Sequence, residues 1–360
     1  MRRLIHKDSP HSDLADSLYI IGNVYDEMGD QTKALECYQE SLTMRRLIHQ
    51  DSPHSDLAAS LISIAKVYAE IGDQIKTLKY SQEGLAICRL INKDSPDTLT
   101  AACLNNIGYA YDNMGDQTKA LEYYQESLTM NRLIHKDSPH LDVANSLFNI
   151  GDVYNKMGDQ INALEYFQES LTMRRLIHQD SPHSDVADSL DNIGYVYNKM
   201  GDKTKALEYH QESLTMRRLI HQDSPHSDVA DSLCNIGYVY NKIGDQTKAL
   251  EYFQESLTMR RLIHQDSPHP DVADSLCNIG YVYNEMGDQT KALEYCQESL
   301  TMRRLIYQDS PHSDVANSLY NIGNVYNEMG DQTKALEYHQ ENLTMRRLIH
   351  QDSPHSDIAW

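Results

Sequence analysis

Histidines are the side chains of this chain whose type and spacing could bind a metal ion. Pairs of them stand five positions apart in several short segments, as in His221 and His226. A zinc site usually includes cysteine, or places two histidines four residues apart on one face of a helix. Neither pattern accompanies these pairs. We therefore interpret them as polar side chains near helix ends and predict no metal site and no cofactor.

No segment carries a motif of a known catalytic site. The sequence contains no glycine-rich phosphate loop, no HExxH and no GxSxG. Every serine, histidine or aspartate that could complete a catalytic triad recurs at the same place in copy after copy of one repeated phrase. Recurrence of this kind indicates a structural role, and we predict that the chain is not an enzyme.

The cysteines favour a reducing environment. None of the six stands in a CxxC spacing, so we expect neither disulfides nor zinc coordination. The N-terminal residues lack the apolar core of a signal peptide, and no stretch approaches the ~20 apolar residues of a membrane span. We expect a cytoplasmic location. The cysteines are Cys37, Cys88, Cys103, Cys234, Cys277 and Cys296.

The elements that would position any site follow from an internal repeat. The dipeptide Gly-Asp recurs eight times at a spacing of 43 residues. A fixed period between about 20 and 50 residues is typical of a solenoid, in which each copy buries its apolar face against its neighbours. The eight glycines are Gly29, Gly72, Gly115, Gly158, Gly201, Gly244, Gly287 and Gly330.

The copy at residues 184–226 illustrates the helices that the repeat predicts. Apolar residues at helical spacing indicate a first helix that Ser184 caps and that ends at Gly201. Asp202 can cap a second, longer helix that ends near His221, before a proline. No strand pattern is present.

Two small residues in each copy indicate where the paired helices approach each other. In this copy they are Gly194 and Ala206, and the second copy departs with Ala65 and Thr77. Glycine inside a helix costs about 0.5–1 kcal/mol relative to alanine, so its recurrence implies a packing reason.

The spacing of these residues resembles the tetratricopeptide repeat (TPR) pattern. Leu190, Ile193, Gly194, Tyr197 and Ala206 match it, and most other copies match at the equivalent positions. The resemblance implies an all-α fold, an α-solenoid of eight tandem helical hairpins wound into a right-handed superhelix. The aromatic position of the second helix varies in this chain, as Tyr38, Ser81, Tyr124, Phe167, His210, Phe253, Cys296 and His339.

The long period and the Arg-Arg-Leu-Ile ending of the second helix resemble the kinesin light chain and nephrocystin-3 branch of this family. Kinesin light chains use such repeats to hold peptides of cargo adaptors. We place the end of a preceding repeat plus a loop in residues 1–14, eight repeats in residues 15–350 and the start of a truncated ninth in residues 351–360, as in a piece of a longer array. The repeat cores are 15–48, 58–91, 101–134, 144–177, 187–220, 230–263, 273–306 and 316–349.

The resemblance also implies that the first helices line a concave groove for a peptide. Asparagine offers one acceptor and two donors, which suits the backbone of an extended peptide, and tyrosine supplies apolar area with a polar tip. The alternative is that the asparagines bridge adjacent repeats. The candidates are a first asparagine set (Asn106, Asn149, Asn192, Asn235, Asn278, Asn321), four tyrosines (Tyr109, Tyr195, Tyr238, Tyr281) and a second asparagine set (Asn198, Asn241, Asn284).

Charge narrows the choice of partner. Lysine and arginine total 32 against 53 acidic residues, a net charge of -21, which disfavours nucleic acid and anionic membranes. Acidic residues before the core leucine, such as Asp188 and Asp231, favour neutral or basic peptides. We interpret the recurring arginine pair, as in Arg217 and Arg218, as a charge at the helix end.

These observations predict a non-enzymatic protein-interaction scaffold or adaptor that binds an extended peptide segment in the groove. Two alternatives stay open: a motor cargo adaptor of the kinesin light chain type, and the TPR arm of a larger signalling enzyme or ATPase. The copies 184–226 and 227–269 differ at only four positions. Such similarity favours a ladder of equivalent sites over one specialised site, and the oligomeric state is left open.

Overall fold

The computed structural model describes residues 11–351 except positions 51, 94, 137, 180, 223, 266 and 309. Across these residues it contains sixteen helices and no strand. Residues 1–10 and 352–360, which make up most of the predicted flanking segments 1–14 and 351–360, lie outside the described residues. The helices are α2 (Ser12–Glu27), α3 (Gln31–His49), α4 (Ser55–Ile71), α5 (Gln74–Asn92), α6 (Thr98–Asn113), α7 (Gln117–His135), α8 (Leu141–Met157), α9 (Gln160–His178), α10 (Ser184–Met200), α11 (Lys203–His221), α12 (Ser227–Ile243), α13 (Gln246–His264), α14 (Pro270–Glu285), α15 (Gln289–Tyr307), α16 (Ser313–Glu328) and α17 (Gln332–Gln351).

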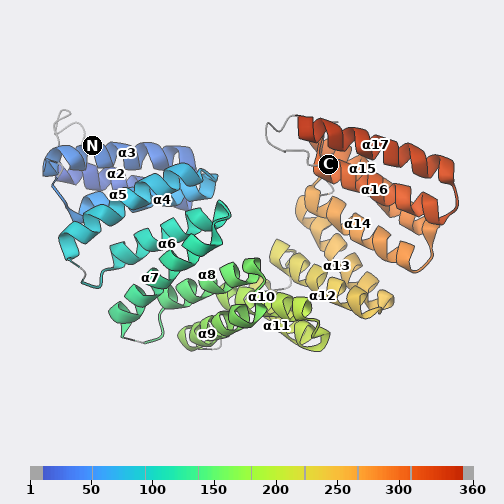
Figure 1. Ribbon diagram of the computed structural model, residues 1–360, viewed down its shortest axis with the longest axis horizontal. Coiled ribbons are helices and arrows are strands. Elements are labelled where there is room, and N and C mark those ends of the chain that lie inside the picture. The colour runs from blue at the N-terminus through green and yellow to red at the C-terminus, as the bar shows by residue number, and fades with distance from the viewer. Residues whose placement is uncertain are drawn as a thin grey trace. The chain divides into compact units, whose positions relative to one another are not determined.

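The chain divides into two compact units, residues 1–181 with α2 to α9 and residues 182–360 with α10 to α17. Inside each unit, consecutive helices pair into four hairpins, and each hairpin packs against the next (Figure 1). The prediction of an all-α solenoid is confirmed for the described residues. The right-handed winding and the repeat boundaries stay predictions.

Histidine, rather than serine, caps most of the first helices. In α10 the backbone N–H of Asp185 donates to Nδ1 of His183 at 3.2 Å, and Ser184 is already the first helical residue. The prediction that Ser184 is the cap is therefore wrong by one position, because an imidazole nitrogen can accept the same free N–H as a hydroxyl. In α6 the carboxylate of Asp97 takes this role and accepts from Thr100 N at 2.9 Å.

The turn inside each hairpin follows the predicted pattern. Gly201 ends α10 with a φ of 89°, in the left-handed region that favours glycine. Asp202 caps α11 by accepting from the N–H of Lys205 at 3.1 Å. The second helix ends at His221, as the sequence predicted.

One contact explains the glycine that recurs in the first helix of most hairpins. A Cβ added to Gly194 would lie 2.9 Å from the ring of His210, and one added to Gly237 would lie 2.8 Å from Phe253. The glycine thus leaves room for the variable side chain of the second helix. In the second hairpin an alanine replaces the glycine and Ser81 occupies the variable position. The larger residue on the first helix is thus matched by a smaller side chain on the second helix.

The first arginine of the recurring pair joins neighbouring hairpins. Arg260 of α13 is 8% exposed and donates to the backbone oxygen of Asp271 at 2.9 Å and to the carboxylate of Asp231 at 2.6 Å. The second arginine, Arg261, pairs with Glu298 of the next hairpin at 2.6 Å. The prediction of a simple helix-end charge is therefore wrong, because a buried guanidinium needs several acceptors and two hairpins supply them together.

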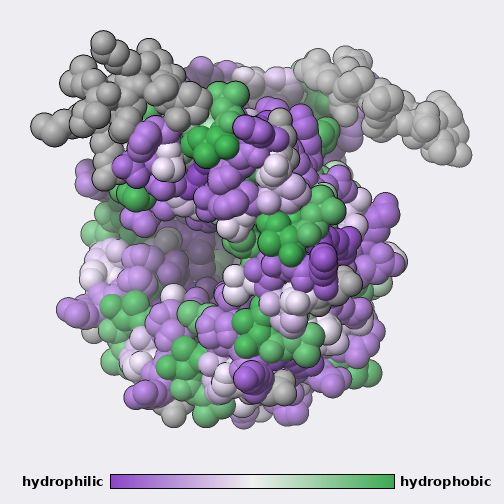
Figure 2. Space-filling view, turned by 90° about the vertical axis from the view of Figure 1, so that its left-hand side faces the viewer, coloured by the Kyte–Doolittle hydropathy of each residue, from purple (hydrophilic) through white to green (hydrophobic). Residues whose placement is uncertain are grey.

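On the face seen in Figure 2, hydrophilic side chains dominate and hydrophobic ones form separate patches. On the second helices a leucine recurs as an exposed residue; Leu219 and Leu262 are 62% and 61% exposed. None of the described helices combines the length and apolar character needed to cross a membrane.

Candidate peptide-binding face

The predicted tyrosines lie exposed on the first helices of the hairpins. Within each unit we call the surface formed by the first helices its first-helix face; the helices are α2, α4, α6 and α8 in one unit and α10, α12, α14 and α16 in the other. The four tyrosines have exposed fractions of 39–48%, so their rings can contact a partner. They are Tyr109 of α6, Tyr195 of α10, Tyr238 of α12 and Tyr281 of α14.

Several asparagines of the first set hold neighbouring helices together. Asn149 donates to Oδ1 of Asn105 at 2.9 Å, and Asn321 donates to Sγ of Cys277 at 3.0 Å. The alternative interpretation, that these side chains bridge adjacent repeats, therefore applies to part of the set. Peptide binding by the set stays a prediction. All six members are half-buried: Asn106, Asn149, Asn192, Asn235, Asn278 and Asn321.

The second asparagine set lies near the C-terminal ends of the first helices. The side-chain oxygen of Asn198 accepts from Nζ of Lys203 at 2.6 Å. The Oδ1 atoms of Asn241 and Asn284 are buried and accept no hydrogen bond from any described residue. A buried acceptor without a donor costs about 1–3 kcal/mol, so a ligand that donates a hydrogen bond there gains that free energy.

The acidic positions before the core leucine are paired with the buried arginines. Oδ1 of Asp188 lies 2.8 Å from Nη2 of Arg217. Asp191 is buried and contacts Arg217 at 2.6 Å and His210 at 2.9 Å. Burial by itself would lower the pKa of Arg217, but the attraction of Asp191 and Asp188 raises that pKa above its usual value. These carboxylates therefore add less to the charge that a partner meets than the sequence indicated.

A different position carries the exposed charge of the first-helix face. It recurs once in each copy, is exposed throughout, and changes from acidic to basic and back along the chain. The 43-residue spacing of the sequence reveals this position. The copies therefore differ in the charge that they expose at this position. In chain order the residues are Glu27, Glu70, Asn113, Lys156, Lys199, Lys242, Glu285 and Glu328.

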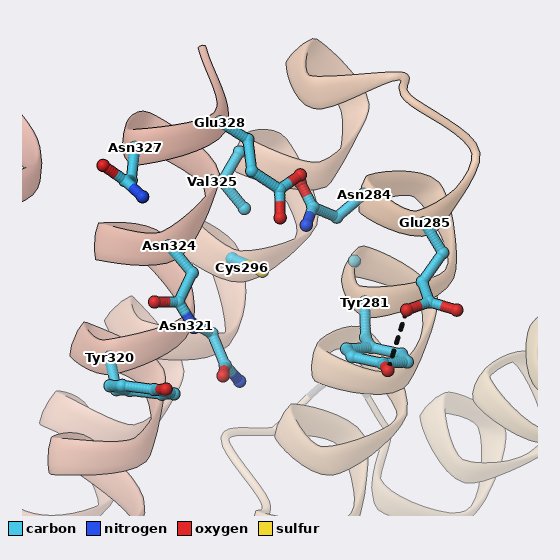
Figure 3. A pocket seen from close by; sticks show the side chains of 11 residues that line it. Tyr281, Asn284, Glu285, Cys296, Tyr320, Asn321, Asn324, Val325, Asn327 and Glu328 are labelled. Atoms are coloured by element: carbon cyan, nitrogen blue, oxygen red, sulfur yellow. Dashed lines mark hydrogen bonds between the residues drawn. The ribbon is translucent and has the colours of Figure 1, made fainter. Parts of the chain in front are cut away.

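A pocket of about 380 Å³ lies between α14 and α16 (Figure 3). Figure 3 shows Asn284 of α14 and Glu328 of α16 reaching into the space between the two helices from opposite sides. On the same helix as Asn284, the hydroxyl of Tyr281 donates to Oε1 of Glu285 at 2.9 Å. The rest of the lining comprises Gly280, Cys296, Tyr320, Asn321, Asn324, Val325 and Asn327.

The variable core position is small in this hairpin and forms part of the pocket lining. Cys296 occupies the position of Phe253 in the preceding hairpin, and Gly280 beside it has no side chain. Burial raises the pKa of the Cys296 thiol to about 12, so the floor of the pocket is uncharged at neutral pH. In the sequence Cys296 stands out only as a departure from the family pattern, because nothing in the sequence connects that position with the surface.

The histidine pairs lie together near a carboxylate where one hairpin meets the next. The rings of His221 and His226 stack with their centroids 3.5 Å apart, and Oδ2 of Asp228 lies 3.6 Å from a nitrogen of each. Five such groups occur among the described residues. Because the rings are nearly parallel, their nitrogen lone pairs lie in separate planes and do not converge on one ion. Nδ1 of His226 instead accepts the N–H of Asp228, as a helix cap.

Family models identify the repeat. A model of the tetratricopeptide repeat matches residues 56–132, 185–262 and 271–347, which is more than half of the chain. A second model of the same repeat matches residues 15–46 and 144–175. No curated protein sequence matches this chain.

Several solved structures are similar to this one. BtubC (BKLC) from P. vanneervenii is 21% identical with a TM-score of 0.57, over 65% of this chain and 92% of that chain. A kinesin light chain-like protein from Podosopora anserina with nearly identical TPR-like repeats is 17% identical with a TM-score of 0.51, over 58% and 98%. A STAND signal transduction ATPase with a tetratricopeptide repeat sensor, from Pyrococcus horikoshii, is 14% identical with a TM-score of 0.67, over 94% and 48%. At these identities the likeness shows a shared fold.

Proposed function

From the premise that this chain belongs to the tetratricopeptide repeat family, we propose that it is a non-enzymatic interaction scaffold or adaptor that binds an extended peptide segment along its first-helix face. Such folds are generally scaffolds with protein partners. We further propose a cytoplasmic location, repeats bounded as the sequence analysis places them, and partners with neutral or basic segments.

The observation that carries this proposal is the row of exposed tyrosines with amide side chains beside them. In the second unit the row comprises Tyr195, Tyr238 and Tyr281, and the unfilled acceptors of Asn241 and Asn284 lie on the same helices. Tyrosine gives contact area at a low entropy cost, and an amide bonds the backbone of a peptide whatever its sequence. Several such contacts along one extended peptide make the overall affinity higher than the modest affinity of each single contact.

A library of random nonapeptides displayed on phage tests the proposal with the full chain as bait. We expect recovered peptides to bind at least tenfold more weakly to the variant Tyr195→Ala/Tyr238→Ala/Tyr281→Ala, since each buried interface tyrosine contributes about 1–2 kcal/mol. Tyr238 also donates to Oδ1 of Asn278 on the neighbouring helix at 2.9 Å, so thermal unfolding of the variant is measured beside its peptide affinity.

The matched control carries the same number of truncations on the second helices. Leu219→Ala/Leu262→Ala/Leu305→Ala changes residues that are 61–64% exposed, so it should leave both peptide affinity and thermal unfolding unchanged. If peptides bind the tyrosine variant as tightly as the original chain, or lose affinity equally for both variants, the first-helix face is not the binding surface.

A second candidate function is the repeat arm of a larger signalling enzyme or ATPase. Its support is the match to the STAND ATPase, which covers 94% of this chain but 48% of that one. An ATP-binding loop in the same reading frame would favour this candidate. The likeness to the Podosopora repeats supports another candidate, an adaptor of the kinesin light chain type. A binding assay with a kinesin heavy chain would test this candidate.

A further inference from the structure

We infer that the pocket between α14 and α16 receives an arginine side chain of the bound peptide. The inference rests on the proposed function and makes one hairpin junction of the array more specific than the others. It follows from the acceptors, the walls and the floor of the pocket, and from what replaces them in the neighbouring hairpins.

The pocket offers acceptors for a cation and no cation of its own. Glu285 and Glu328 place two carboxylates at it, and the buried Oδ1 of Asn284 has no donor among the described residues. None of the eleven lining residues, all of them described, is a lysine or an arginine. A guanidinium has five N–H donors and no acceptor, so it can satisfy the amide oxygen and a carboxylate at the same time.

Aromatic rings flank this set of acceptors. Tyr281 on α14 and Tyr320 on α16 line the pocket and are 48% and 49% exposed. A planar guanidinium stacks on such rings, while an ammonium is a compact and more strongly hydrated charge. The walls therefore favour arginine over lysine, and the carboxylates disfavour an acidic side chain.

The neighbouring junctions lack this combination. At the corresponding junction one hairpin earlier, Phe253 replaces the cysteine at the floor and Lys242 replaces the glutamate at the rim. In α4, which also carries a glutamate at this position, Nζ of Lys66 lies 2.9 Å from Asp26 and 3.6 Å from Glu70. A lysine of the chain itself already neutralises that acidic site.

The test selects the same nonapeptide library on the original chain and on the variant Cys296→Phe. The variant reproduces the interior of the preceding hairpin. There Phe253 packs on Gly237, and Cys234 stands at the position that corresponds to Cys277. We therefore expect the variant to fold. We expect arginine to be enriched at one peptide position by the original chain, and the enrichment to be lost with Cys296→Phe and with Glu328→Gln.

The matched control is Cys296→Ser, which keeps the floor small and occurs naturally as Ser81 in the second hairpin; it should retain the enrichment. A selected peptide resynthesised with citrulline in place of arginine should bind about tenfold more weakly, since citrulline keeps the shape and removes the charge. The affinity of a peptide with lysine at this position should lie between those of the arginine and citrulline peptides.

Two results would separate this inference from the proposed function. If peptides are recovered but show no arginine preference, or keep it with Cys296→Phe, the pocket assignment is wrong and the scaffold proposal stands. If neither bait recovers any peptide, the scaffold proposal is wrong and the pocket assignment fails with it.

Discussion

The hairpins α12–α13 and α14–α15 follow each other in the chain and differ at five of 43 positions. Both keep a histidine N-cap on the first helix, a glycine with positive φ in the turn and the same buried arginine. Two of the five differences change the surface that a peptide would meet. Lys242 becomes Glu285, and Phe253 becomes Cys296. Near-identical repeats can thus share one scaffold and still present different sites, because few side chains decide the local charge and volume.

The core of the two hairpins should respond very differently to truncation. Phe253 is 1% exposed and belongs to an apolar cluster with Leu276 and Ile279. Phe253→Ala should lower the free energy of unfolding by about 3–4 kcal/mol, and Cys296→Ala by about 1 kcal/mol, because far less volume is removed. Urea unfolding followed by circular dichroism measures both. Equal losses would show that Cys296 packs as tightly as the phenylalanine and would contradict the pocket.

The difference in binding should be transferable. The double variant Lys242→Glu/Phe253→Cys changes the junction between α12 and α14. It introduces there the glutamate and the cysteine that line the pocket between α14 and α16. A peptide with two arginines at the spacing of the two pockets should then bind about tenfold more tightly than to the original chain, since a second charged contact is gained. Fluorescence anisotropy measures this, with Phe253→Cys alone as the control. Unchanged affinity would mean that other residues define the pocket.

The smallest effect concerns the loops that follow the two hairpins. His264 stacks on His269, while Tyr307 stacks on His312 and donates to Oδ2 of Asp314 at 2.8 Å. Tyr307→Phe keeps the ring and removes the hydrogen bond, so it should cost about 0.5–1 kcal/mol of unfolding free energy.

The contribution of Tyr307 has a defined pH dependence. Burial and the hydrogen bond to Asp314 raise the pKa of Tyr307 in the folded chain. A raised folded-state pKa means that the contribution is fully present below the unfolded pKa of about 10 and is lost as the pH rises through the folded pKa. Urea unfolding at pH 7 and above pH 10 should therefore show the two proteins converging at high pH. A loss that is constant with pH would exclude the hydrogen bond as its cause.

The sequence and the structure agree best on features that depend on nearby residues. The two helices of each copy, the left-handed glycine at Gly201 and the Asp202 cap were all predicted. The Ser184 cap was missed by one residue, because serine and histidine stand side by side and both side chains can accept a backbone N–H. The residues that end a helix lie within one turn of that end, so the sequence contains the information needed to predict it.

Features that join positions far apart were missed. The copies 184–226 and 227–269 differ at four positions, and two of these form one pair in space. Asp191 bonds His210 in one hairpin, while Cys234 and Phe253 share an apolar cluster in the next. The sequence shows these as independent substitutions. Only the packed helices show that a hydrogen-bonded polar pair has been exchanged for an apolar one.

By itself the sequence determined the repeat length, the helices, their turns and the membership of an all-helical family, because periodicity and capping act over a few residues. The tertiary structure decided which charges remain available to a partner and where a pocket opens. Asp188 is neutralised by Arg217, and the pocket above Cys296 opens between α14 and α16. Burial, ion pairing and volume depend on which helices meet, and helices of different hairpins meet only in the folded chain.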